Sequence, residues 1–199
     1  MDKFTDPDLG TVFKQFYYLN AAESEEYGVD EGWYQYTDED SVYLMNDRID
    51  LPYGQGFVFD AKDKGAQLCF AGEVKDGATL KTVHGKFNLV GNVSPVDLKL
   101  GDFTCNNTTW DGSSVYFISA TGGMAKFTDE DLGTVFKQFY YLNPSEAEEY
   151  SVDPGWYQYT DEDSNYLMNE KIDVPAGAGI VFDAKDAGAE FIVPKVLTK

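Results

Sequence analysis

Residues 12–19 read VFKQFYYL, and residues 135–142 repeat these eight residues without a change. The identity extends outward from this stretch. Aligned without a gap at an offset of 123 residues, Lys3–Phe70 and Lys126–Val193 are identical at 50 of 68 positions. Self-similarity at a fixed period indicates a tandem duplication. The chain therefore has the order B–A–B, in which the duplicated unit B flanks a segment A that occurs once.

Three segments follow from this order: a first copy of B (residues 1–74), segment A (residues 75–125) and a second copy of B (residues 126–199). Segment A and the second copy, about residues 79–197, are expected to form the complete domain. The sequence leaves open which copy packs on segment A. The first copy either packs on it as well, in one B–A–B body, or is a half-domain without a partner.

The decisive stretch has the pattern of a β-strand, because its side chains would point alternately to two faces and β-branched and aromatic residues are frequent. Gly and Pro punctuate further short apolar runs, which are typical of strands. These predicted strands are residues 56–59, 67–70, 87–90, 96–100 and 114–118. Short strands at this spacing predict a mainly β, β-sandwich-like module built from the internal repeat.

One or two short helices per repeat remain compatible with the pattern. Thr5–Asp8 resembles a helix N-cap followed by acidic residues, so Leu9–Tyr18 is an alternative helix. Ala and Glu also cluster in residues 21–27, and in residues 144–150 of the second copy, which predicts a short helix there.

The charge narrows the classes of partner. The 199 residues carry 35 acidic and 15 basic side chains, a net charge of −20. This field repels nucleic acids and anionic membrane surfaces, so neither is an expected partner. No apolar run has the length of a membrane helix, so membrane insertion is not expected. Residues 1–4 are not followed by the apolar region of a signal peptide, so an extracellular location requires a signal outside this sequence.

The sequence does not predict an enzyme. His84 is the one histidine, and no Gly-x-Ser-x-Gly motif accompanies it. A nucleophilic triad needs a base held beside a nucleophile by an orienting acid, and no such group is apparent. We therefore expect no catalytic residues.

Aromatic residues form the first candidate site. Trp33, Tyr34 and Tyr36, with their counterparts Trp156, Tyr157 and Tyr159, lie at neighbouring positions of a predicted strand. One face of such a strand faces the core, and the other is available to stack on a sugar ring. A carbohydrate-binding module is thus the alternative function, and core packing is the simpler interpretation.

Acidic loops form the second candidate site. Asp38 and Asp40, and their counterparts Asp161 and Asp163, lie in loops with three acids each. Such loops offer several oxygen ligands, so weak calcium binding is the one cofactor considered. The glycine and glutamate of an EF-hand are missing, and solvated turns explain the loops equally well.

The two cysteines, Cys69 and Cys105, are too few to define a disulfide framework or a zinc site. Ile192 is the counterpart of Cys69, which favours a buried, reduced thiol at this position. Pairing of the two cysteines is the alternative.

Two stretches carry a resemblance to a known family. Residues 85–92, GKFNLVGN, resemble the "GWNLVGNP" opening of a β-domain found in secreted and surface proteins of Gram-negative bacteria. Residues 172–182, and residues 49–59 in the first copy, resemble the closing "I-P-x-G-x-G-F-x-V" stretch of that domain. Phe87 replaces the Trp of the motif, and Val93 replaces its Pro. The resemblance implies an extracellular β-sandwich-like module of unassigned function, and no catalytic residues.

The predicted function is a non-catalytic, structural or adhesive repeat module of a secreted or cell-surface protein. Its expected partners are other copies of itself, neighbouring repeats, a glycan or a surface protein. An unpartnered first copy would expose apolar residues and an unpaired sheet edge, and such edges recruit other chains. The residues predicted to be exposed are Val12, Phe13, Phe16, Tyr17, Phe57 and Phe59.

Overall fold

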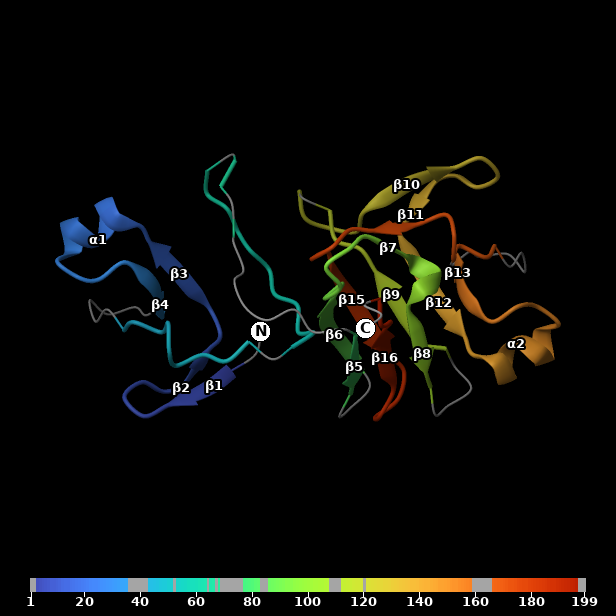
Figure 1. Ribbon diagram of the computed structural model, residues 1–199, viewed down its shortest axis with the longest axis horizontal. Helices are drawn as coiled ribbons and strands as arrows, with labels where there is room; N and C mark the ends of the chain where they lie inside the picture. Colours follow the sequence, from blue (N-terminus) through green and yellow to red (C-terminus); the bar gives the residue numbers. More distant parts are fainter. Residues whose placement is uncertain are drawn as a thin grey trace. The chain divides into compact units, whose positions relative to one another are not determined.

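The computed structural model describes residues 3–35, 43–51, 53–63, 65–66, 68, 77–82, 86–107, 112–119, 121–158 and 166–196. These residues are mainly β, with several sheets and two short α-helices, as predicted (Figure 1). The chain divides into two compact units, Met1–Leu51 and Pro52–Lys199. No helix among the described residues has the length and apolar character needed to span a membrane.

The first unit contains two β-hairpin-like pairs and a helix. Strand β1 (Lys3–Asp6) pairs antiparallel with β2 (Gly10–Phe13), and β3 (Phe16–Leu19) pairs antiparallel with β4 (Gly32–Gln35). The alternative helix over Leu9–Tyr18 is therefore wrong. The Asp6 carboxylate accepts hydrogen bonds from the N–H groups of Asp8 and Leu9, and Gly10 has a φ of 69°. These features make a turn rather than a helix.

The short helices are confirmed in both copies. Helix α1 (Ala21–Tyr27) begins at a capping box, in which Asn20 and Glu23 accept hydrogen bonds from each other's backbone N–H groups. Helix α2 (Pro144–Tyr150) has the same capping box, formed by Asn143 and Glu146. A capping box satisfies N–H groups that the first turn leaves without partners, so the sequence fixes where each helix begins.

The second unit is built on a five-stranded antiparallel sheet in the order β13-β12-β9-β15-β6 (Figure 1). A three-stranded sheet has the order β5-β16-β8, and β14-β7 and β10-β11 form separate pairs. The strands from segment A are β5 (Ala78–Lys81), β6 (Lys86–Gly91), β7 (Leu98–Lys99), β8 (Thr104–Asn106) and β9 (Ser114–Tyr116), with a 3-10 turn at Leu100–Asp102. The strands from the second copy are β10 (Lys126–Asp129), β11 (Gly133–Phe136), β12 (Gln138–Leu142), β13 (Gly155–Gln158), β14 (Asp173–Val174), β15 (Gly179–Ala184) and β16 (Glu190–Val193).

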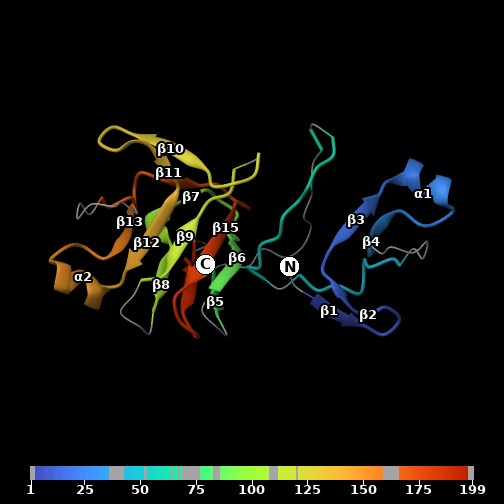
Figure 2. The same ribbon diagram turned by 180° about the vertical axis from the view of Figure 1, so that it is seen from behind.

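Segment A and the second copy share one core. Strand β9 lies between β12 and β15, and β16 lies between β5 and β8, so each sheet contains strands of both segments paired with one another. The core contains residues of segment A: Val90, Leu98, Leu100, Phe103, Cys105, Val115 and Phe117. It also contains residues of the second copy: Phe139, Tyr141, Trp156, Met168, Ile172, Val174, Ile180, Phe182, Ala184, Ala189, Phe191 and Val193. Helix α2 lies beside β12 (Figure 2), and its Ala147 joins a smaller cluster with Leu142 and Tyr157.

The predicted strand at residues 56–59 is wrong, although its counterpart β15 is a six-residue strand. The reason is competition for partners. Strand β15 pairs with β9 on one edge and with β6 on the other, and β9 pairs with β12 on its second edge. The second copy therefore occupies both edges of β9 and one edge of β6, and residues 56–59 have no equivalent place. The predicted strand at residues 67–70 lies largely outside the described residues.

Candidate interaction surface

The predicted aromatic positions of the second copy lie inside the core. Trp156 is fully buried, and its indole N–H donates to the carbonyl oxygen of Phe103 at 2.8 Å. Tyr157 is buried, and its hydroxyl donates to the carbonyl oxygen of Asp153 at 2.6 Å. These two side chains pack and satisfy their polar groups internally. Tyr159 lies outside the described residues.

The same positions of the first copy are partly accessible. Tyr34 is buried and donates to the carbonyl oxygen of Asp30, as its counterpart does. Trp33 is half-buried and lies 5.1 Å from the ring of Tyr18, measured between ring centroids. Tyr36 lies outside the described residues. Trp33 is thus the described candidate whose ring keeps exposed area.

The predicted calcium ligands Asp38, Asp40, Asp161 and Asp163 all lie outside the described residues. Within the described residues, no group of three or more His, Cys, Asp or Glu side chains has the arrangement of a metal site. Weak calcium binding by the acidic loops stays a prediction.

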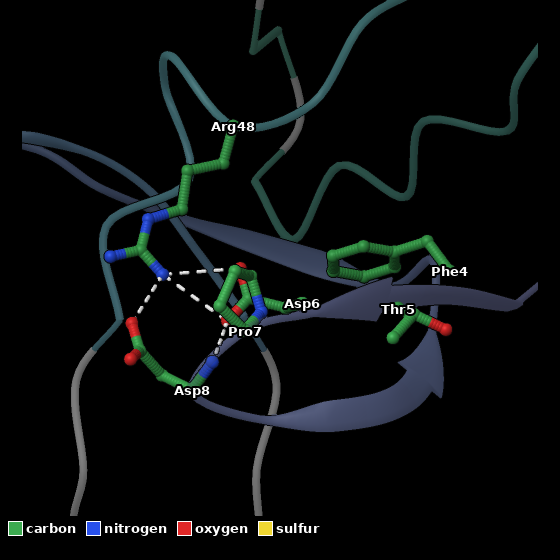
Figure 3. A pocket seen from close by; sticks show the side chains of 6 residues that line it. All are labelled: Phe4, Thr5, Asp6, Pro7, Asp8 and Arg48. Atoms are coloured by element: carbon green, nitrogen blue, oxygen red, sulfur yellow. Dashed lines mark hydrogen bonds and ion pairs between the residues drawn. The ribbon is translucent and has the colours of Figure 1, made fainter.

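A second acidic group, Asp6 and Asp8, lines a shallow pocket together with Arg48 (Figure 3). The Arg48 guanidinium contacts Asp6 at 3.1 Å and Asp8 at 3.0 Å. The backbone N–H of Asp8 lowers the pKa of the Asp6 carboxyl, and Arg48 lowers it further. Both carboxylates are paired with the Arg48 guanidinium. This ion pair connects the β1–β2 turn to residue 48.

The second copy has the same arrangement with lysine in place of arginine. The Lys171 ammonium donates to Asp129 at 2.7 Å, and this hydrogen bond is the main reason that the pKa of Asp129 lies below its usual value. In each copy an ion pair therefore connects the hairpin turn to a later loop of the same copy.

Cys105 is a free, buried thiol in β8. Its Sγ lies 3.0 Å from Asn107 Oδ1, to which Ser113 Oγ also donates at 2.6 Å. Burial raises the pKa of the Cys105 thiol to about 12. A protonated, enclosed thiol is a poor nucleophile, so this group packs rather than reacts. The prediction for Cys69 lies outside the described residues.

The most informative difference between the two copies is the burial of equivalent side chains. Val174, Ile180 and Phe182 of the second copy have exposed fractions of 0%, 1% and 0%. Their first-copy equivalents Leu51, Phe57 and Phe59 have exposed fractions of 63%, 44% and 41%. Tyr141 and Tyr18 differ in the same direction, at 6% and 45%. Apolar residues that form core in the second copy thus form surface in the first.

The strand edges differ in the same way. Strand β12 has a neighbour on each edge, β13 and β9. Its first-copy equivalent β3 pairs with β4, and the part of the chain that the structure describes provides no second neighbour. We call residues 53–61 the open surface of the first copy.

Residues 55 and 56 of this open surface pair with a strand of segment A. Gln55 forms an antiparallel bridge with Val90 of β6, and the Gly56 N–H donates to the carbonyl oxygen of Leu89 at 2.9 Å. The opposite edge of β6 pairs with β15, the second-copy counterpart of residues 56–61. Both copies of this stretch therefore bond to the same strand, one on each edge.

The predicted exposure of the first copy is only partly confirmed. Phe13, Phe57 and Phe59 are exposed, whereas Val12, Phe16 and Tyr17 are half-buried. Phe136, the counterpart of Phe13, is equally exposed, so Phe13 does not depend on segment A. Sequence reasoning missed four exposed residues of the first copy: Tyr18, Tyr27, Leu51 and Val58. Comparison of the exposed fractions at equivalent positions of the two copies identifies these residues.

The comparisons with known proteins add no relative: no family model, curated protein or solved structure matches the chain.

Proposed function

We propose that the chain is a non-catalytic module of a repeat-built protein of the cell surface or extracellular space. In this proposal segment A and one copy of B form a β-sandwich-like domain, and a B copy without segment A contacts further copies. The observation that supports this is the burial difference at equivalent positions: Leu51, Phe57 and Phe59 are surface, and Val174, Ile180 and Phe182 are core.

The physical argument rests on adjacent apolar area and an open strand edge. Exposed apolar residues that lie close together mark interaction sites more often than scattered ones do. An edge strand offers unpaired N–H and C=O groups to an incoming strand. The net charge of −20 opposes indiscriminate association, so contacts should form where short-range complementarity is good.

Sedimentation velocity over a concentration series tests the proposal. We expect the average mass of the chain to rise with concentration, and the double variant Phe57→Asp/Phe59→Asp to remain monomeric. The matched control is Phe13→Asp/Phe136→Asp, which adds the same charge at positions that are exposed at 48% in both copies. The control should associate like the original chain.

Two outcomes contradict the proposal: a monomer at every concentration, or equal association of both double variants. A glycan array provides the arm for the alternative function. Glycan binding that is lost in Trp33→Ala would favour a carbohydrate-binding module instead.

A further inference from the structure

The second unit contains two stretches of nearly the same sequence and one position for them in its five-stranded sheet. Residues 56–63 and 179–186 differ only at Phe57, which corresponds to Ile180. Strand β15 lies between β9 and β6 and pairs with both. We call this position the central slot. Both neighbouring strands belong to segment A, so either stretch would meet the same partners there.

The side chains that the central slot buries have counterparts in residues 56–61. Ile180 and Phe182 have exposed fractions of 1% and 0% in the slot. Their counterparts Phe57 and Phe59 have exposed fractions of 44% and 41%. Transfer of this apolar area from water into the core would be favourable. Residues 56–61 therefore have the sequence of the central strand and expose the apolar side chains that a central strand buries.

Residues 55 and 56 already contact β6 on its other edge, within the same compact unit. Gln55 bridges antiparallel to Val90, and the Gly56 N–H donates to the carbonyl oxygen of Leu89 at 2.9 Å. In the register of β15, Phe57 would instead lie opposite Val90, a shift of two residues. An even shift leaves each side chain on the same face, and the direction relative to β6 also stays antiparallel. Insertion thus requires a change of edge without a reversal of the strand.

Two features favour β15 in the slot. Its connections are short, with four residues between Val174 and Gly179 and five between Ala184 and Glu190. A phenylalanine at the position of Ile180 would also overpack a core that fits isoleucine. Occupation by β15 is therefore the major arrangement, and an arrangement with residues 56–61 in the slot would be a minor population.

We propose that residues 56–61 exchange with β15 in the central slot of the same chain. In the exchanged arrangement, residues 56–61 form the central strand, and residues 179–184 are released and expose Ile180 and Phe182. The exchange determines which copy of B presents the apolar stretch, so the duplicated strand is a two-state element. A strand in the same unit has a higher effective concentration than a strand of another chain. The exchange therefore does not depend on the self-association of the proposed function.

Disulfide trapping tests the exchange in the full chain with Cys69→Ala and Cys105→Ala. Tyr116 of β9 lies opposite Val181, so Val58 would lie opposite Tyr116 after the exchange. Opposite Cα atoms are about 4.5–5.5 Å apart, within the range of a disulfide. A strand on the other edge of β6 is three strand spacings from β9, about 14 Å. Val58→Cys/Tyr116→Cys should therefore form a bond in the exchanged arrangement and not in the major one.

Oxidised glutathione is the oxidant, and peptide mass spectrometry measures the initial rate of bond formation in the monomer. We expect the bond to form, and Phe57→Ile to raise its rate about fivefold or more because the overpacking is removed. The matched control Phe59→Asp should lower the rate about tenfold or more, since an unpaired carboxylate would be buried in the slot. Phe59 is exposed in the major arrangement, so this control leaves access through global unfolding unchanged.

Absence of the bond in Val58→Cys/Tyr116→Cys overturns the proposal if Val181→Cys/Tyr116→Cys, the pair of the major arrangement, forms one under the same conditions. An equal rate with and without Phe59→Asp also overturns it, because the bond would then form through unfolding. A bond found only in disulfide-linked dimers overturns exchange within one chain as well.

Discussion

Replacement of Phe182 by alanine should destabilise the second unit far more than the same replacement of Phe59, its counterpart in the first copy. Phe182 is fully buried, lies opposite Val115 in β9, and has its ring centroid 5.3 Å from that of Phe191. Truncation of a core phenylalanine removes its contacts and leaves a cavity, at a cost of about 3–5 kcal/mol. Phe59 is exposed at 41%, so its truncation should cost roughly 0.5–1 kcal/mol.

Thiol labelling of Cys105 measures this difference within the second unit, because Cys105 is buried and lies opposite Phe191 in the β8–β16 pair. In a Cys69→Ala background, the labelling rate under native conditions reports the free energy of opening. Because 1.4 kcal/mol corresponds to a factor of ten, Phe182→Ala should accelerate labelling by roughly 10²- to 4 × 10³-fold. Phe59→Ala should change it less than about tenfold.

Equal acceleration by the two variants would refute the reasoning, since it would mean that residues 56–61 already form part of a closed core. An effect of Phe182→Ala below about 1 kcal/mol would also refute it, because the shared core would then not depend on β15. Circular dichroism of each variant provides the control for global unfolding.

The remaining predictions concern a glycine, an ion pair and a tryptophan. Gly112→Ala should destabilise the second unit by about 1–3 kcal/mol in urea unfolding, because its Cβ would collide with the backbone carbonyl of Tyr141, whereas Gly179→Ala, with open space around the Cβ, should cost less than about 1 kcal/mol. Asp129→Asn should lower the unfolding free energy at neutral pH. The folded-state pKa of Asp129 lies below 3.8, so this difference should shrink as the pH falls below that value and the carboxyl is protonated; a pH-independent difference in urea midpoints would contradict it. Trp156→Phe loses a buried indole hydrogen bond and should cost about 1–3 kcal/mol, measured by the same unfolding experiment.

Local signals in the sequence were sufficient to predict the two short helices, whose hydrogen bonds join residues close together in the chain. The clustering of Ala and Glu in residues 21–27 and 144–150 predicted both helices. The structure adds a capping box at Asn20 and Asn143, which satisfies backbone donors at each helix start. The alternative helix over Leu9–Tyr18 was wrong because acidic residues after Thr5 are compatible with either a helix start or a turn. Here Asp6 accepts from two backbone N–H groups and turns the chain instead.

Pairing between distant segments could not be predicted in the same way. Residues 56–61 and 179–184 have nearly the same sequence, yet β15 is a strand and its counterpart is not. The difference lies in the partner strands, because a β-strand is stabilised by its neighbours rather than by its own residues. The candidate surface was predictable in kind, as an unpartnered B copy. Its residues were not, because they depend on which copy holds segment A.

The order of segments along the chain accounts for which copy holds segment A. From the end of β9 at Tyr116 to the start of β12 at Gln138 the chain has 22 residues to close, whereas from the end of β3 at Leu19 to the start of β9 at Ser114 it has 95. Loop-closure entropy grows with the logarithm of length, so the shorter connection is favoured by about 1.3 kcal/mol when side chains are equal.

For β6, the connection to the first copy is the shorter one. Strand β6 begins 25 residues after Ala61, whereas β15 begins 88 residues after the end of β6. This agrees with the contact that residues 55 and 56 make on the outer edge of β6. The inner edge of β6 nevertheless pairs with β15. Strand β15 lies between β6 and β9, and β9 already pairs with β12, so the strand that bridges β9 and β6 must come from the copy that holds β9.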